Sequence, residues 1–374
     1  MKGTNVMRSM TALALVLAFT ACGGGSASGA GTGAGPIAGT PAPPAPLPPP
    51  PTPNNYAPGP AAHATTGVAL PLGKCVNLSN MLEAPNEGDW GRAFQDQDAT
   101  RIRQAGFATV RLPVRFSGHA SAAPPYTIDA AFMARVHHVV DANLAAGLNV
   151  IIDLHNYDEL FVDPDGHKAR FAELWRQIGA SFQAAPANVW FELINEPHGA
   201  LADANLLAVL TPALAALRTS NPTRPVIVGG QNYSGVDSLA TIAFPNDPNI
   251  VATFHYYDPF DFTHQGATFV NPVLPTGRQF GTAADNAQLD SNLMKIMNFM
   301  SRTGRVPFAG EYGAYDQIPL DQRVAYYRTV SAAFASIGVQ SCAWGYTNTF
   351  HLWNDSTGWI TQIRDAIATT TTIQ

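Results

Sequence analysis

From Thr66 onward, short runs of apolar and β-branched residues alternate with longer segments in which apolar residues recur every three or four positions. The first pattern is typical of buried strands and the second of amphipathic helices. The strand-like runs cover residues 75–79, 109–114, 149–155, 189–196, 225–230, 250–257, 306–313 and 339–346. Helical patterns lie between them, at 132–146, 171–182, 206–217, 289–300 and 324–337. This alternation predicts repeated βα units and a parallel sheet.

Strands and helices in this number favour a closed (β/α)8 barrel, the TIM barrel of the α/β class, over an open doubly wound sheet. Glycines that can end helices follow several of the helical patterns, at Gly106, Gly147 and Gly338. An open dinucleotide-binding sheet would carry G-x-G-x-x-G after its first strand, and no such motif follows residue 79. We therefore predict one barrel domain over residues 67–374, long enough to bury a large core.

Residues 1–21 have the pattern of a bacterial export signal. Lys2 and Arg8 supply positive charge, and the apolar run at 11–20 is too short to span a membrane. Small residues before Cys22 and glycines after it resemble a lipobox, in which the cysteine becomes the lipidated first residue. We expect an exported cell-envelope lipoprotein, in the outer membrane or at the cell surface, attached to the membrane only through lipid at Cys22. Ordinary signal cleavage, which would give a secreted protein, is the alternative.

Residues 22–66 are predicted to be a disordered tether rich in Gly, Ala and Pro. Positions 23–66 contain no Asp, Glu, Lys or Arg and hold 12 of the chain's 30 prolines. Such a composition cannot build a core, and its proline-rich part favours an extended chain. Without Cys22, two cysteines remain, Cys75 and Cys342. Export makes a disulfide between them possible, and two separate buried cysteines are the other interpretation.

The charge of the chain argues against one class of partner. Without the expected signal segment, 19 basic residues face 27 acidic ones, a net charge of −8. Nucleic-acid-binding proteins instead concentrate Lys and Arg on one face. We expect no nucleic acid as partner, and a neutral polysaccharide or oligosaccharide fits better. We also expect a monomer.

The predicted strand ends carry the candidate chemistry, because a (β/α)8 barrel places its active site at the carboxyl ends of its strands. Polar residues and one tryptophan gather there: Arg111, Asp153, His155, Asn195, Glu196, His255, Tyr257, Glu311 and Trp344. Burying the two glutamates is costly without a purpose or a partner. Glycoside hydrolysis supplies a purpose, since it uses one carboxyl group as acid and another as nucleophile or base. The alternative is that each glutamate only pairs with Arg111 or another base.

Four sequence runs carry a resemblance to a known family. They are VNLSNMLEAPNEGDWG at 76–91, VRLPVRFSGH at 110–119, ELINEPHG at 192–199 and HYYDPFDFTHQGA at 255–267. In this order, on these predicted strands, they resemble family-5 glycoside hydrolases, the cellulase family, and most of all bacterial endo-β-1,4-glucanases with related mannan-active enzymes. The resemblance runs from about residue 73 to the end of the chain.

The resemblance implies a role for each matching residue. Glu196 would be the general acid/base, and Glu311 the nucleophile of a retaining, double-displacement reaction. Asn195 would bind the 2-hydroxyl of the reacting sugar. The remaining matches divide into residues that support the glutamates, namely Arg111, Tyr257, His155 and His255, and residues that bind the substrate, namely Asn80, Glu83, His119, His264 and the stacking platform Trp344. Asn156, which departs from the family pattern, is expected to bind the substrate as well.

Three positions depart from the pattern of these relatives. Asn156 stands where a second histidine usually follows His155, Phe269 where tryptophan is common, and Gly345 where glutamate often follows Trp344. They surround substrate subsites in the relatives, so they bear on the polymer and not on the reaction. We expect an endo-acting enzyme for cellulose-type or mixed-linkage β-1,4-glucan. A β-mannanase, or an enzyme that cleaves both polymers, is the alternative.

Two other classes remain as alternatives. A metal-dependent barrel hydrolase would begin with H-x-H on its first strand, which here reads CVNLS, so we expect no metal and no cofactor. A surface lipoprotein that binds glycan without cleaving it would suit a tether equally well, but both glutamates are present. The chain has no G-x-S-x-G, H-E-x-x-H or P-loop pattern to indicate a serine hydrolase, a zincin or an NTPase.

Overall fold

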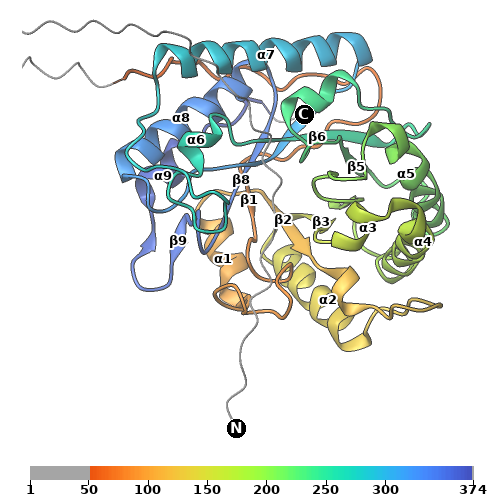
Figure 1. Cartoon of the computed structure of the whole chain (residues 1–374). Helices are drawn as coiled ribbons and strands as arrows, with labels where there is room; N and C mark the ends of the chain where they lie inside the picture. Colours follow the sequence, from red (N-terminus) through yellow and green to blue (C-terminus); the bar gives the residue numbers. More distant parts are fainter. Residues whose placement is uncertain (1–50, 373–374) are drawn as a thin grey trace, which may run out of the picture.

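A closed barrel of eight parallel strands forms the centre of the molecule (Figure 1). The structure, a computed structural model, describes residues 51–372. Each strand pairs with its neighbours in the chain, and the last strand pairs with the first. The strands are β1 (Cys75–Asn77), β2 (Thr109–Val114), β3 (Asn149–Leu154), β4 (Val189–Glu192), β5 (Val226–Gly229), β6 (Ile250–Tyr256), β7 (Phe308–Tyr312) and β8 (Ser341–Ala343). The predicted barrel is confirmed, and every strand lies within a predicted run.

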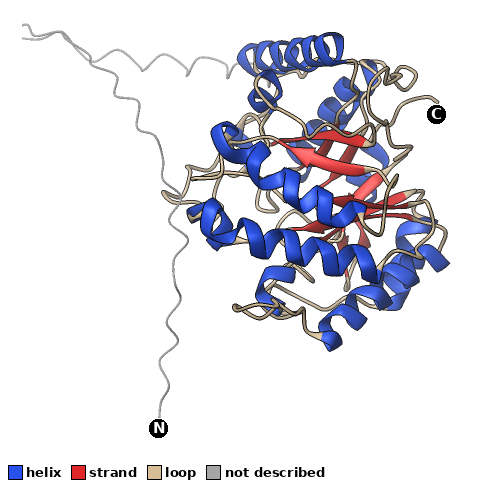
Figure 2. Cartoon of the chain, turned by 90° about the vertical axis from the view of Figure 1, so that its right-hand side faces the viewer, coloured by secondary structure: helices blue, strands red, loops and turns tan. Residues whose placement is uncertain are grey.

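Helices surround the barrel (Figure 2). They are α1 (Asp96–Gln104), α2 (Ala130–Ala145), α3 (Asp158–Val162), α4 (Pro164–Ser181), α5 (Asp203–Arg218), α6 (Phe260–Thr263), α7 (Ala283–Thr303), α8 (Leu320–Ser336) and α9 (Thr361–Ala366). The five predicted helical segments correspond to α2, α4, α5, α7 and α8. The prediction missed α1, because only Asp98, Ala99 and Ile102 of this helix are buried and its apolar periodicity is weak.

Three short elements complete the fold. Two are 3₁₀ helices, η1 (Phe116–His119) after β2 and η2 (Val236–Ala240) between β5 and β6. The third is a hairpin of β9 (Trp353–Asn354) and β10 (Gly358–Trp359), which follows β8.

Successive residues of each strand point to opposite faces, so the strands divide the core in two. Val150, Ile152 and Val226 belong to the larger apolar cluster, which includes the helices. The alternate residues Ile151 and Ile227 belong to a smaller cluster that fills the amino-terminal end of the barrel. Its buried members are Leu70, Leu72, Cys75, Ile151, Trp190, Ile227, Val251, Phe308 and Cys342.

The segment before the barrel differs from the predicted tether. Residues 54–66, which the sequence analysis assigned to a disordered linker ending at residue 66, lie against α7 and α8 (Figure 1). Backbone N–H groups of Gly59, Ala62 and Thr65 donate to carbonyls of Ala335, Gly338 and Gly304, at 2.8–2.9 Å. These carbonyls lie at helix carboxyl ends, where backbone acceptors lack helical partners. The folded domain therefore begins before residue 67. Backbone hydrogen bonds to helix ends hold this segment, and amino-acid composition does not predict such bonds.

The predictions about the export signal, Cys22 and the start of the linker concern residues 1–50, which lie outside the described residues. Within 51–372, none of the helices combines the length and apolar character that crossing a membrane requires.

A disulfide joins the first strand to the last. Cys75 and Cys342 are direct partners in the β1–β8 pairing, and both are completely buried. The disulfide left open by the sequence is thus formed, at the seam where the barrel closes. It links residues 267 positions apart. Disulfides persist in oxidising compartments, and export of the chain stays a prediction.

We expect Cys75→Ala/Cys342→Ala to lower the free energy of unfolding by about 2–5 kcal/mol, because the disulfide restricts a very long loop of the unfolded chain. Urea titration of the double variant and of the oxidised wild type measures this. Reductant added to the folded wild type should act slowly, since both sulfur atoms are buried. Equal unfolding midpoints for the two proteins would show that the seam depends on strand pairing alone.

Candidate active site

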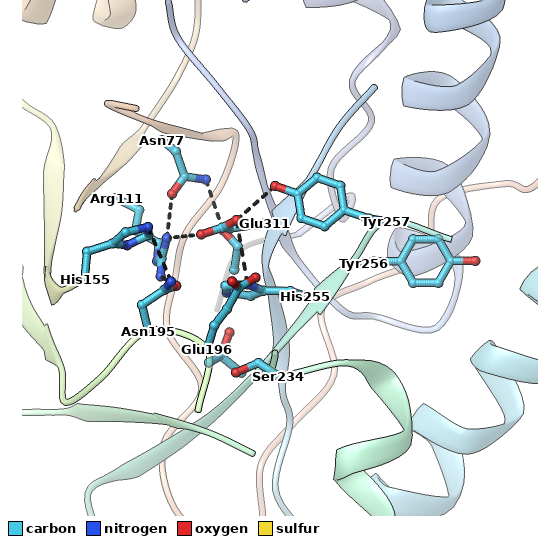
Figure 3. Close-up of polar contacts among 12 residues, drawn as sticks. Asn77, Arg111, His155, Asn195, Glu196, Ser234, His255, Tyr256, Tyr257 and Glu311 are labelled. Atoms are coloured by element: carbon cyan, nitrogen blue, oxygen red, sulfur yellow. Dashed lines mark hydrogen bonds and ion pairs between the residues drawn. The ribbon is translucent and has the colours of Figure 1, made fainter. Parts of the chain in front are cut away.

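Polar side chains converge at the carboxyl ends of the strands (Figure 3). Every contributing strand is parallel to the others, so their ends meet at one edge of the barrel. The contributing residues are Asn77 of β1, Arg111 of β2, Asp153 and His155 at the end of β3, Glu192, Asn195 and Glu196 at and after the end of β4, His255 of β6, Tyr257 directly after β6, Glu311 of β7 and Trp344 after β8.

Arg111 lies at the centre of this cluster and is completely buried. Its Nε and Nη2 atoms donate to the two carboxylate oxygens of Glu192, each at 2.8 Å. Nη2 also donates to Asn195 Oδ1 at 2.8 Å. Nη1 donates to Asn77 Oδ1 at 3.0 Å and to Glu311 Oε1 at 2.8 Å. A guanidinium group has five N–H donors, so all of them are used here.

Three carboxylates surround this one guanidinium. Besides Glu192 and Glu311, Asp153 Oδ2 lies 3.1 Å from Nη2. Burial opposes the charge of Arg111, but the carboxylates, Asp153 foremost, outweigh burial and raise its pKa well above the ordinary value. Burial also raises the pKa of Asp153 to about 7, although Arg111 acts in the opposite direction. The cluster therefore concentrates more negative than positive charge.

Glu311 is held by two donors. Arg111 binds one carboxylate oxygen, and the Tyr257 hydroxyl donates to the other at 2.9 Å. Burial and the Glu311 charge raise the pKa of Tyr257 well above its ordinary value, so the phenol keeps its proton and remains a donor. The two contacts hold the carboxylate of Glu311 in one orientation.

Glu196 has different surroundings. Its side chain is 24% exposed, whereas that of Glu311 is 5% exposed. Burial raises the pKa of Glu196. His255 Nδ1 lies 2.8 Å from Glu196 Oε1 and 3.7 Å from Glu311 Oε2. One carboxylate oxygen of each glutamate and one ring nitrogen of His255 all lie within 4.8 Å of one another.

The backbone at the site has unusual conformations. Glu196 has φ +48°, in the left-handed region that non-glycine residues rarely adopt. Asn232, Tyr233 and Ser234, which follow β5, have φ values of +52°, +59° and +54°. The two loops support each other, because Tyr233 N–H donates to the carbonyl of Pro197 at 3.1 Å. Such strain persists where the surroundings over-determine the backbone, as they do at functional sites.

His155 connects three side chains. Its Nδ1 lies 2.5 Å from Asp153 Oδ2, and its Nε2 lies 3.3 Å from Asn195 Nδ2. The ring is stacked against Trp344, with centroids 5.7 Å apart and planes 10° apart. Burial lowers the pKa values of His155 and His255 to about 4, so both rings are neutral near neutral pH.

Three of the predicted substrate-binding residues form a second group. Both carboxylate oxygens of Glu83 accept backbone N–H groups, from Asn80 and from Met81. Asn156 Nδ2 donates to the carbonyl of Glu83 at 3.1 Å. Burial raises the pKa of Glu83 to about 8, to which the charge of Glu311 adds. Glu83 is thus electrostatically coupled to the central cluster.

The two remaining histidines differ in position. His264 packs its ring on Phe260, at 4.1 Å, and edge-on to Tyr257, at 5.1 Å, so it adjoins the central cluster. His119 stacks on Phe132 of α2, at 3.7 Å. Among residues 51–372, no hydrogen bond or ring contact joins His119 to the central cluster. The other predicted site residues that the structure describes therefore fall into the central cluster and the second group around Glu83, and within 51–372 His119 has no such contact with either.

Two of the sequence departures have clear surroundings. A Cβ atom at Gly345 would collide with the Ser79 side chain, so any larger residue at this position would require Ser79 to move. Phe269 is 51% exposed and lies edge-on to His264, at 6.0 Å. An exposed aromatic ring beside the cluster is suited to stacking on a sugar.

Sequence reasoning missed several residues of the cluster. Asn77 and Glu192 bind Arg111 and are almost completely buried; their polar identity inside predicted strands was the available signal. Asp153 was among the strand-end candidates, but sequence reasoning assigned it no role. It also missed an aromatic stack beside Glu196, in which Tyr233 lies on His198 at 4.3 Å. No sequence signal links these two loops, which meet only in the folded chain.

Glu196, His255 and Glu311 have ligand types that could hold a metal ion. Their atoms are already hydrogen-bonded, however: Glu311 to Arg111 and Tyr257, and Glu196 to His255. A guanidinium 2.8 Å from Glu311 also repels a cation. The contacts therefore favour a pair of catalytic carboxyl groups over a metal centre.

Comparison with known proteins agrees with this geometry. The sequence profile of the family described as Cellulase (glycosyl hydrolase family 5) matches residues 72–349. The chain is similar to Endoglucanase H of Acetivibrio thermocellus, with 34% identity over 277 residues. The match covers 73% of this chain and 29% of that protein, so the chain spans less than a third of that relative's length.

Solved structures are similar over most of the barrel. One described as an endoglucanase has 37% identity and a TM-score of 0.78, covering 79% of this chain and 97% of the other. Thermotoga maritima Cel5A, solved with cellobiose and with mannotriose, has 35% identity and a TM-score of 0.77 in each complex. Each comparison covers 79% of this chain and 97% of Cel5A.

We expect Arg111→Met to lower the free energy of unfolding by about 3–5 kcal/mol at neutral pH, because buried carboxylates lose their cation. Those carboxylates would then bind protons more readily in the folded than in the unfolded chain. The loss should therefore be larger at about pH 8 than at about pH 5, where protonation removes part of the charge.

Denaturant titrations of the variant and the wild type across this pH range test the expectation. Arg176→Met is the matched control, since Arg176 pairs with Glu173 on the surface and should affect stability little at any pH. A loss at Arg111 that is equal across the pH range would mean that lost packing, and not charge, is responsible.

Proposed function

The chain belongs to the cellulase family, glycosyl hydrolase family 5. We propose that it hydrolyses internal bonds of β-1,4-linked glucan, with retention of anomeric configuration. The observation that carries this proposal is the pair Glu196 and Glu311, with oxygens within 4.8 Å of each other and with different surroundings. Retaining glycosidases have carboxyl groups about 5–5.5 Å apart, whereas inverting enzymes need room for a water between them.

The surroundings support a distinct role for each glutamate. Glu311, which accepts from Arg111 and Tyr257, is the nucleophile: its carboxylate attacks the anomeric carbon as the bond to the leaving oxygen breaks. Glu196, more exposed and with a raised pKa, gives its proton to that leaving oxygen. In the second step Glu196 takes a proton from water, whose oxygen attacks the anomeric carbon and releases Glu311.

Neighbouring residues support binding of the reacting sugar. Asn195 lies between Arg111 and His155, with one N–H of its amide left for the sugar 2-hydroxyl. Trp344 presents an aromatic platform for the same sugar. On the side of Glu196, Tyr233 is 51% exposed and stacked on His198, which suits it to the leaving part of the polymer.

The choice of polymer is the finer part of the proposal. β-Glucan is ranked first because the similar proteins include endoglucanases. β-Mannan is the second candidate, since Cel5A, which is similar over most of the barrel, was solved with both cellobiose and mannotriose. Glu83 and Asn156, which contact each other, are the side chains on which this distinction is expected to depend.

We expect Glu311→Gln to lower kcat by on the order of 10⁴-fold or more on every substrate, because the nucleophile is lost. Glu196→Gln should cost on the order of 10²–10⁴-fold on polymer but much less on an aryl glycoside whose leaving group needs no proton. The alkaline limb of the pH profile, set by loss of the Glu196 proton, should disappear with that activated substrate. Initial rates on both substrates measure these effects.

Two further measurements test the mechanism. Azide should restore activity to Glu311→Gly by occupying the vacated position of the nucleophile. Proton NMR should show that the first-formed product retains the β-configuration, and an inverted product would contradict the retaining mechanism. Glu173→Gln, at a surface ion pair, is the control and should leave the rates unchanged.

We expect the highest turnover on carboxymethyl-cellulose and barley β-glucan, with less on galactomannan and little on xylan. Asn156→His should change the ratio of glucanase to mannanase activity more than it changes the pH optimum, because the residue lies beside Glu83 and away from the two glutamates. A reducing-end assay across the panel measures both. Turnover of mannan without turnover of β-glucan would reverse the ranking, and activity on short aryl glycosides alone would contradict endo-cleavage.

A further inference from the structure

A series of hydrogen bonds runs from Arg111 through Asn195 and His155 to Asp153. Figure 3 labels the first three of these residues. Every residue in this series is buried, and Asp153 is completely so. The series ends at Asp153, on the side of His155 away from Asn195. Figure 3 shows the guanidinium of Arg111, the amide of Asn195 and the ring of His155 close together on one side of Glu311.

The direction of each hydrogen bond follows from the first one. A guanidinium group can only donate, so the Asn195 atom 2.8 Å from Arg111 Nη2 must be the oxygen. The Asn195 amide nitrogen, a donor only, then faces His155 Nε2 at 3.3 Å. His155 Nε2 must accept, and the proton of the neutral ring is therefore on Nδ1. That N–H group donates to Asp153 Oδ2 at 2.5 Å.

Within residues 51–372, the hydrogen bond to His155 is the one that the Asp153 carboxylate makes. The five N–H donors of Arg111 are used by Glu192, Asn195, Asn77 and Glu311, so the 3.1 Å approach of Asp153 to Arg111 is an ionic contact only. Among residues 51–372, Asp153 Oδ1 has no hydrogen-bond partner. A buried carboxylate whose one hydrogen bond goes to a histidine ring is the arrangement that selects a tautomer.

We propose that Asp153 is a positioning residue for the hydrolytic reaction: it holds His155 in the Nδ1–H tautomer, and His155 thereby orients the amide of Asn195 toward the sugar 2-hydroxyl. This proposal rests on the proposed function. With the opposite tautomer, the Nε2–H group of His155 would face the amide N–H of Asn195, donor against donor. The amide would turn away or rotate, and its free N–H would leave the sugar.

The orientation of the His155 ring also affects Trp344, which is stacked against it. The indole lies nearly parallel to the imidazole, 10° apart, so the plane of His155 also sets the plane of the platform. Asp153 and Asn195 hold that plane from opposite edges of the ring. Asp153 is therefore linked to both contacts of the reacting sugar without touching the sugar.

Kinetics on two matched substrates test the proposal: an aryl β-cellobioside, and its analogue without the 2-hydroxyl on the sugar next to the aryl group. We expect Asp153→Ala to lower kcat/KM for the first by on the order of 10–100-fold, the effect typical of removing a group that orients another. It should lower kcat/KM for the deoxy analogue far less. In an Asn195→Ala background, Asp153→Ala should not change the ratio of kcat/KM for the cellobioside to kcat/KM for the deoxy analogue.

Asp98→Asn is the matched control. Asp98 is also completely buried and pairs with two arginines, Arg92 and Arg101, but it takes no part in the hydrogen bonds that connect Arg111, Asn195, His155 and Asp153. It should lower stability without changing the ratio between the two substrates. If Asp153→Ala lowers kcat/KM equally for both substrates, Asp153 has only a structural role and the proposal is wrong.

A second measurement uses the wild type, so it does not depend on whether a variant folds. ¹⁵N NMR of histidine-labelled protein, with His155 assigned by comparison with His155→Gln, should show a protonated Nδ1 and an unprotonated Nε2. The opposite tautomer would overturn the proposal. Failure of the wild type to cleave either substrate would instead contradict the proposed function, and the tautomer would still be measured.

Discussion

The arrangement of the site depends on one buried guanidinium with every donor occupied. Arg111 donates to two carboxylates and two amides that come from three strands, β1, β7 and the end of β4. Because it can only donate, it determines which atom each neighbour turns toward the centre. It also places positive charge 2.8 Å from a carboxylate oxygen of Glu311, a side chain that is almost completely buried.

The barrel supplies the geometry that this interaction needs. Parallel strands end together, and small irregularities then adjust individual side chains. A register shift between β6 and β7 sets His255 opposite Glu311, and the left-handed backbone at Glu196 presents its side chain beside them. Irregular backbone of this kind costs free energy, which the regular hydrogen bonding of the barrel offsets.

The two ends of the barrel have different tasks. At the amino-terminal end, the apolar cluster around Ile151 and the Cys75–Cys342 disulfide close the core, and residues 54–66 cover the neighbouring helix ends. At the carboxyl end, charged groups are buried at a cost. Stability and chemistry are thus separated along the strands, as is general for this fold.

The sequence by itself determined the strands, their order and the two glutamates, because hydrophobic periodicity and the residues at strand ends are local properties. It also indicated Arg111 and Tyr257 as neighbours of the site, through the runs shared with related enzymes, and His155 through its place at the end of a predicted strand. The disulfide was left open by the sequence, since pairing depends on which strands become neighbours. Only the closed barrel made Cys75 and Cys342 partners.

Tertiary structure alone decided which groups touch and in which protonation state. Glu192 and Asp153 are ordinary acidic residues in the sequence, yet in the fold both contact the guanidinium of Arg111, and Asp153 also accepts a hydrogen bond from His155. Residues 54–66 read as a tether and nevertheless pack on α7 and α8. Hydrogen-bond direction, burial and charge balance arise from contacts between residues far apart in the chain, and no local pattern encodes them.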